Sequence, residues 1–356
     1  MKKIINAFIY VILLVMIYIM CICFDLISQN VKNAFEMCIN SVIPSLFPFF
    51  IISDILQKNM ANHTKGIFSI LYEKIFKFDK STMPVFIAGL ISGYPVGAYM
   101  VHDLYEKKLI TKKDANDLIC FTNNSGPLFI ICTVGIAVYK NINIGLMLYI
   151  IHITSAIITG LTVSFTRTKT NYNSTYFIYE TNDISVLIEK AFFKCIKICG
   201  FIIFFSIINC FIDILLYKWK DFSAYASVIT EITNGINKVA VYFETPKSLC
   251  LASFSLSFSG LSVLLQVKSI CSGKIPIKKY IFYKLFNGCI SYIICAMYFR
   301  IKTDMIFLVC IIYVFVIVIY SLNKNIIVKK QAVPAPYSRA KFDFHLIPRT
   351  KNRNFL

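Results

Sequence analysis

The chain has 356 residues, of which 57% are hydrophobic and only 15% are charged, and its mean hydropathy is +0.68. Soluble globular domains carry about 25% charged residues, so this composition excludes an ordinary soluble domain and favours a protein with several membrane-spanning helices. The formal net charge of +19 does not indicate nucleic-acid binding. The basic residues lie between apolar segments and in the C-terminal tail, and no nucleic-acid recognition fold surrounds them.

The thirteen cysteines form no metal or redox motif. Their number is odd, they are scattered mostly through apolar segments, and no CxxC pair occurs among them. Cysteines in such positions behave as small hydrophobic residues. We therefore expect no disulfide framework, no metal site and no cofactor.

The first apolar segment begins close to the N-terminus. Residues 4–24 contain no charge, and this length is enough to cross a hydrocarbon core of roughly 30 Å. A secretory signal peptide would have a shorter apolar region and a cleavage site of small residues. The sequence Phe24-Asp25-Leu26 offers no such site, so we predict an uncleaved transmembrane helix.

Further apolar segments follow in two groups that are separated by a polar connector. Pro44 and Pro48 are expected to kink the first of them, since proline removes a backbone donor. We predict an all-α polytopic membrane protein with about eight to ten membrane segments. The apolar segments are 42–56, 83–104, 120–135 and 143–165 in the first group, and 191–217, 224–243, 248–271, 280–299 and 305–322 in the second.

The two groups repeat the same order of features. The sequence KLITKK at 108–113 resembles KIPIKK at 274–279, and Gly93 precedes Gly260 by a similar interval. Repeats with discontinuous helices in matching positions are common in secondary transporters. Both linkers are basic, so their charge does not separate parallel from inverted repeats. The predicted organisation is an N-terminal transmembrane helix (1–30), a first membrane repeat (31–165), a connector (166–190), a second repeat (191–300), a last transmembrane helix (301–322) and a basic, disordered cytoplasmic tail (323–356).

Four polar clusters interrupt the apolar segments, at 92–97, 122–127, 230–235 and 257–262. Non-helical backbone at membrane depth is tolerated only inside protein or beside a water-filled cavity. The clusters either line a solute site or are turns at the membrane surface, and their occurrence in both halves favours the first interpretation. The predicted solute-binding residues are Ser92, Gly93, Tyr94, Pro95, Gly97, Thr122, Asn123, Asn124, Ser125, Glu231, Thr233, Asn234, Gly235, Ser257, Ser259, Gly260, Ser262 and Gln266.

Glu231 lies within an otherwise neutral stretch. An acidic group within a membrane segment is costly and by default indicates function. It could bind a cation, hydrogen-bond a polar solute or carry a coupling proton. The alternative is a carboxylate near the interface that pairs with Lys238.

Other polar residues in the apolar segments carry weaker signals. Gln266 could serve in packing or as a hydrogen bond between helices, and Tyr94 could equally be an interfacial anchor. We expect His152 to be a satisfied core histidine, and Asp54 and Asp213 to be solvated at segment ends. HExxH, GxSxG and Walker motifs are absent, so we predict that the protein has no catalytic residues and is not an enzyme.

Five motifs together resemble the sporulation integral membrane protein YlbJ family of endospore-forming bacteria. They are VIPSLFPFF (42–50), SGYPVGA (92–98), FTNNSGPLFI (121–130), EITNG (231–235) and SFSGLSVLLQVKSI (257–270). That family belongs with proteins that carry the nucleoside-recognition gate domain. Similar domains occur in concentrative nucleoside transporters, ferrous-iron transport permeases and spore maturation membrane proteins.

The chain departs from the family pattern at two positions. Ser259-Gly260 stands where paired glycines are usual, and Ser-Gly-Pro follows Asn124 where an asparagine often precedes the proline. The resemblance implies gate-like repeats and a role in producing resistant spores, and it does not supply a solute.

Two functions from different classes follow from these features. The first is a transporter or channel for a small polar solute, nucleoside-like or other, with or without a coupling ion. The second is a membrane scaffold or assembly factor for spore envelope maturation. The expected partners are the lipid bilayer, the solute, and either a second copy of the chain or other sporulation membrane proteins, with no nucleic acid. Basic residues next to the terminal segments place both termini of this bacterial cell-membrane protein in the cytoplasm.

Overall fold

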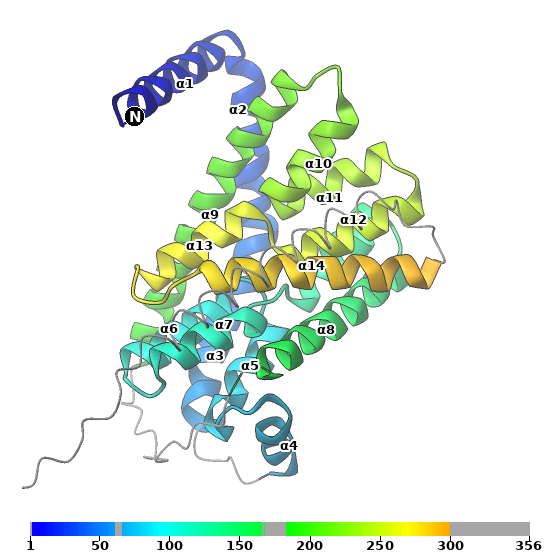
Figure 1. Ribbon diagram of the computed structural model, residues 1–356. Coiled ribbons are helices and arrows are strands. Elements are labelled where there is room, and N and C mark those ends of the chain that lie inside the picture. Colours follow the sequence, from blue (N-terminus) through cyan, green and yellow to red (C-terminus); the bar gives the residue numbers. More distant parts are fainter. Residues whose placement is uncertain (1, 61–65, 166, 168–182, 300–356) are drawn as a thin grey trace, which may run out of the picture. The chain divides into compact units, whose positions relative to one another are not determined.

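The computed structural model describes residues 2–60, 66–165, 167 and 183–299. In this part of the chain all regular structure is helical, which confirms the all-α class (Figure 1). The helices are, in chain order, α1 (Lys2–Ile22), α2 (Phe24–Met37), the π-helical η1 (Cys38–Val42), α3 (Ile43–Met60), α4 (Ile67–Phe76), the short 3-10 helix η2 (Lys80–Thr82), α5 (Met83–Ile91), α6 (Val96–Glu106), α7 (Lys112–Thr122), the π-helical η3 (Leu128–Val138), α8 (Ile142–Phe165), α9 (Ile184–Leu215), α10 (Lys220–Thr230), α11 (Ile232–Tyr242), α12 (Thr245–Phe258), α13 (Gly260–Cys271) and α14 (Lys278–Phe299).

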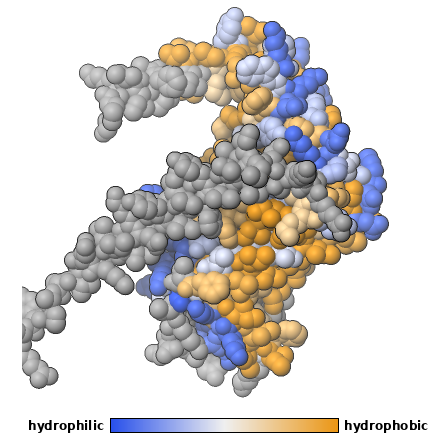
Figure 2. Space-filling model, turned by 45° about the vertical axis from the view of Figure 1, so that its right-hand side comes forward, coloured by the Kyte–Doolittle hydropathy of each residue, from blue (hydrophilic) through white to orange (hydrophobic). Residues whose placement is uncertain are grey.

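Five helical stretches are long and apolar enough to cross a membrane. They are Phe24–Ile55, Ile142–Phe165, Ile184–Leu215, Thr245–Cys271 and Lys278–Phe299. Shorter apolar helices lie at Leu13–Ile22, Lys80–Ile91 and Leu128–Val138. Figure 2 shows hydrophobic residues gathered over much of one face of the molecule, with hydrophilic residues along its border. These features confirm a polytopic membrane protein.

Several predicted parts lie outside the described residues. They are most of the connector at 168–182, the last transmembrane helix at 301–322 and the basic tail at 323–356. The proposed domain boundaries therefore stay a prediction.

Pro44 and Pro48 do not end the helix in which they lie. The chain remains helical from α2 through α3, and the π-helical turn η1 ends at Val42, two residues before Pro44. A π-helical turn accommodates one extra residue in the hydrogen-bonding pattern, which suits a position where proline cannot donate. Pro48 lies inside α3.

The two basic linkers lie at the same end of the fold. Lys274 follows α13, and its Nζ atom is 2.7 Å from the carboxylate of Glu106, the last residue of α6. In both halves a broken helical pair leads into a linker and then into a further helix, α7 or α14, and these two helices pack against each other. The internal repeat and its orientation stay a prediction. The halves differ in that α14 is continuous, whereas residues 123–127 separate α7 from η3.

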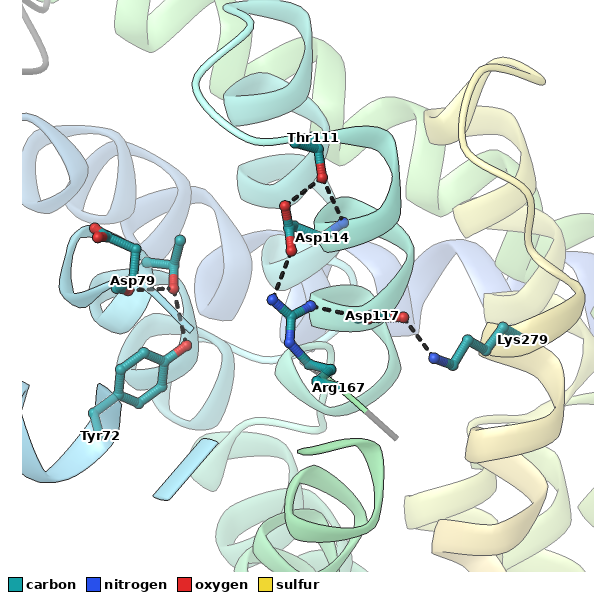
Figure 3. Close-up of polar contacts among 8 residues, drawn as sticks. Tyr72, Asp79, Thr111, Asp114, Asp117, Arg167 and Lys279 are labelled. Carbon is teal, nitrogen blue, oxygen red and sulfur yellow. Dashed lines mark hydrogen bonds and ion pairs between the residues drawn. The ribbon is translucent and has the colours of Figure 1, made fainter. Parts of the chain in front are cut away.

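A buried ionic cluster ties the N-terminal part of α7 to its neighbours (Figure 3). Arg167, beyond the end of α8, donates to Asp114 at 2.6 Å and to Asp117 at 2.9 Å. Lys279, at the start of α14, lies 2.5 Å from the other oxygen of Asp117. Thr111 caps α7 by accepting from the backbone N–H of Asp114. The two carboxylates and two cations neutralise one another, so the cluster stabilises this end of the helices without leaving a net charge.

We expect Arg167→Met to lower the free energy of unfolding by about 3–5 kcal/mol, because it leaves two buried carboxylates short of one cation. Thermal denaturation of the purified protein in detergent measures this loss. Lys107→Met is the matched control, since the Lys107–Asp103 pair is solvent-accessible and is expected to contribute about 0–1 kcal/mol. Equal losses in the two variants would contradict a stabilising role for the buried cluster.

Candidate functional site

All four predicted polar clusters border one cavity of about 340 Å³. Its walls also include residues of η1, α3 and α9. Glu231 is the only charged residue among the described residues that line it. The predicted site residues that line the cavity are Ser92, Gly93, Tyr94, Ser125, Glu231, Thr233, Ser262 and Gln266.

The two breaks of the first half touch each other through their backbones. Gly93, between α5 and α6, has a φ of +93°, and a Cβ atom on it would lie 3.0 Å from the backbone nitrogen of Gly126. A Cβ atom on Gly97 would lie 2.1 Å from the carbonyl oxygen of Thr122. Only glycine allows backbones to approach this closely. The close approach brings the end of α7 against the start of α6.

Glu231 forms the break between α10 and α11 and is 95% buried (5% exposed). Its side chain accepts from the backbone N–H of Asn234 at 2.8 Å and so caps α11. A carboxylate is favoured there, because a helix N-terminus carries partial positive charge and unpaired N–H groups. The alternative pairing with Lys238 is wrong, since Lys238 pairs with Asp213 at 2.5 Å. No basic side chain of the described residues forms an ion pair with Glu231.

His152 joins a break of the first half to a break of the second. Its Nε2 atom accepts from the backbone N–H of Ser125 at 3.0 Å, and its Nδ1 atom lies 2.7 Å from the Ser257 hydroxyl. Because Nε2 accepts, Nδ1 carries the proton of the neutral ring and donates to Ser257. His152 is therefore the satisfied core histidine that we expected, and it also connects α8 to two breaks.

Tyr94 makes a second connection between the halves. Its hydroxyl group donates to the carbonyl oxygens of Leu256 and Ser257, at 3.1 and 3.4 Å. Tyr94 is only 9% exposed, so the alternative of an interfacial anchor is wrong. Asp54, which we expected to be solvated, has a side chain that is only 19% exposed and pairs with Lys194 at 3.3 Å.

Asn123 does not line the cavity, but it forms hydrogen bonds with three residues of other helices. It is fully buried; its Oδ1 atom accepts from the N–H of Ala98 and its Nδ2 atom donates to the Tyr280 hydroxyl at 2.8 Å. Its carbonyl oxygen accepts from Lys284 at 3.1 Å. The sequence analysis did not single out Tyr280 or Lys284. The available signal was a lysine inside an apolar segment, which is unusual at membrane depth.

The remaining predicted residues do not line the cavity and lie in or next to the breaks. Ser262 and Gln266, by contrast, both belong to the lining, and the Nε2 atom of Gln266 donates to the Ser262 hydroxyl at 3.4 Å. The predicted residues outside the lining are Pro95, Gly97, Thr122, Asn123, Asn124, Asn234, Gly235, Ser257, Ser259 and Gly260.

The chain is similar to a bacterial sporulation protein. It is 27% identical over 286 residues to the sporulation integral membrane protein YlbJ of Bacillus subtilis (strain 168), a match that covers 68% of this chain and 69% of that protein. This similarity confirms the resemblance carried by the five motifs. No family model matches the chain, and no solved structure matches it.

We expect Gly97→Ala to lower the free energy of unfolding by at least about 3 kcal/mol, because the added methyl group would overlap the backbone of Thr122. Gly200→Ala is the matched control, since a Cβ atom on Gly200 in α9 would meet nothing within 4 Å. This control is expected to be neutral or stabilising by up to about 1 kcal/mol. Similar melting temperatures for both variants would contradict the close approach of α6 and α7.

We expect Ser259→Gly to stabilise the protein by about 1 kcal/mol, because Ser259 has a left-handed φ of +77° that is costly for a residue with a Cβ atom. Differential scanning fluorimetry would detect the rise in melting temperature. Ser257→Gly is the control. Ser257 lies two residues earlier, within α12, and its hydroxyl group hydrogen-bonds to His152. This substitution should destabilise the protein, so a rise in both variants would contradict the assigned backbone conformation.

Proposed function

We propose that this chain, a member of the YlbJ family of sporulation integral membrane proteins, moves a small polar solute across a membrane during spore formation. The observation that carries the proposal is the convergence of four broken segments on one cavity. Carriers built from discontinuous helices bind solutes where the helices break, because unwound backbone there has free polar groups. The proposed role is non-enzymatic.

The cavity offers both polar and apolar contacts to a solute. Hydroxyl and amide groups come from the breaks and from η1, for example Ser92, Ser262 and Asn40. Apolar walls come from α3 and η3, where Phe49 and Phe129 lie. This combination suits a small polar solute with an apolar face, nucleoside-like solutes among them.

Glu231 is the proposed ionisable group of the cavity. It is buried at the N-terminus of a half-helix, and no cation of the described residues neutralises it. A buried carboxylate without an ion-pair partner lowers stability, so such a residue in a membrane segment by default indicates function. We assign it to hydrogen bonding with the solute or to binding a coupling cation or proton.

The basic linkers give the proposed orientation. Both lie at the end marked by the Glu106–Lys274 ion pair, and basic loops remain in the cytoplasm. We therefore assign this end to the cytoplasmic side of the cell membrane.

A membrane scaffold is the competing function. It would depend on the basic loops and the C-terminal tail rather than on the cavity. The breaks of a scaffold would pack against one another without a need for an unpaired acid in the wall.

We expect Glu231→Gln to reduce the number of heat-resistant spores by about tenfold or more at a normal protein level. Loss of a charged hydrogen-bond partner costs about 1.5–3 kcal/mol, which corresponds to at least about tenfold in affinity. The measurement is spore survival after heating in a spore-forming host whose sole copy is the variant, with membrane levels checked by immunoblot.

Glu244→Gln is the matched control, because it makes the same change at an exposed residue before α12. A deletion of residues 333–356 tests the scaffold. If this deletion abolishes heat resistance while Glu231→Gln has none of the expected effect, the transport proposal is wrong and the scaffold is favoured.

A further inference from the structure

Lys284 is a buried cation in α14 that the proposed solute site does not use. Its exposed fraction is 0%, and it does not line the cavity. Its Nζ atom donates to the carbonyl oxygen of Asn123 at 3.1 Å and lies 4.9 Å from the ring centroid of Tyr94. Among the described residues no carboxylate forms an ion pair with it, in contrast to Lys194, Lys238 and Lys279.

The C-terminal ends of two helices lie near Lys284. Asn123 is the residue at which α7 ends, and helix C-termini carry partial negative charge. The last turn of α12 is nearby, because Tyr94 and Asn287 both donate to its carbonyl oxygen at Ser257. The side-chain oxygens of Asn124 and Asn287 are buried and have no hydrogen-bond partner within the described part of the chain.

Lys284 thus donates to the carbonyl oxygen at a helix C-terminus and has no carboxylate partner within the described part of the chain. In carriers with broken helices, unwound carbonyl groups and half-helix C-termini coordinate the coupling cation. An ammonium group has three donors and no acceptor, so it satisfies the same oxygen atoms as a small inorganic cation.

We propose that Lys284 is a built-in cation, whose ammonium group binds the carbonyl oxygen at the C-terminal end of α7 in the place of a bound inorganic ion. The role of Lys284 in solute movement rests on the proposed transport function. It assigns this step a positive charge that the chain itself supplies next to the break after α7.

Loss of the ammonium group is expected to lower stability. It leaves the buried carbonyl oxygen of Asn123 without its donor, and a buried polar group left unsatisfied costs about 1–3 kcal/mol. Lys284→Met should therefore melt below the temperature of the wild type and fail to support heat-resistant spores.

The cation site itself is tested without transport. Full-length Lys284→Ala is purified in detergent, and its melting temperature is measured with ethylammonium chloride, ethanol or choline chloride at equal concentration. Ethylammonium restores the ammonium group, ethanol fills a similar volume without charge, and choline is too large for the space. We expect ethylammonium to raise the melting temperature by about 2 °C or more above the other two additions.

Wild type and Lys268→Ala, which removes an exposed lysine of α13, should show no such difference. An equal rise with ethanol, or no rise with any addition, overturns the built-in cation. If Lys284→Ala does not fold, Lys284→Met is measured in its place. A Met variant that melts below the wild type and forms no heat-resistant spores supports the proposal, whereas a functional Met variant or one that melts at or above the wild type overturns it.

The two proposals fail in different ways. Rescue by ethylammonium together with heat-resistant Glu231→Gln spores would leave the cation site intact and overturn transport through the cavity. Loss of function in Glu231→Gln without any rescue in Lys284→Ala would overturn the built-in cation alone.

Discussion

The fold depends on satisfying non-helical backbone at membrane depth, and Asn123 takes part in three of the hydrogen bonds at the break after α7. Lipid provides no hydrogen bonds, so each unwound peptide group needs a protein partner. Asn123 receives the N–H of Ala98 and the ammonium group of Lys284, and it donates to Tyr280. Through two contacts of its side chain and one of its backbone carbonyl group, Asn123 connects the break after α7 to α6 and to α14.

The cavity is a consequence of the same constraint. Gly93 and Gly126 bring two unwound segments into backbone contact, and His152 links one of them to Ser257 in the other half. Where helices stop, side chains no longer project at regular intervals to fill the space between them. The breaks therefore produce both the polar groups and the room that a solute requires.

Charges are distributed in two ways in this fold. At the linker end, Asp114, Asp117, Arg167 and Lys279 form a cluster whose charges cancel. At the breaks, Glu231 and Lys284 are buried without an oppositely charged partner among the described residues. Neutralised clusters hold helices together, whereas an unneutralised buried charge is retained at a cost, which is why the two proposals concern Glu231 and Lys284.

The sequence by itself determined the membrane class, the helical segments and the positions of the breaks. Apolar length, glycine and proline act locally along the chain, so the stretch 143–165 and the break at 257–262 could be predicted from their own residues. The tertiary structure alone decided the partners. Lys238 pairs with Asp213 rather than Glu231, Tyr94 lies inside rather than at the interface, and Lys284 meets Asn123. These contacts join residues that are far apart in the sequence, and helix packing rather than local pattern brings them together.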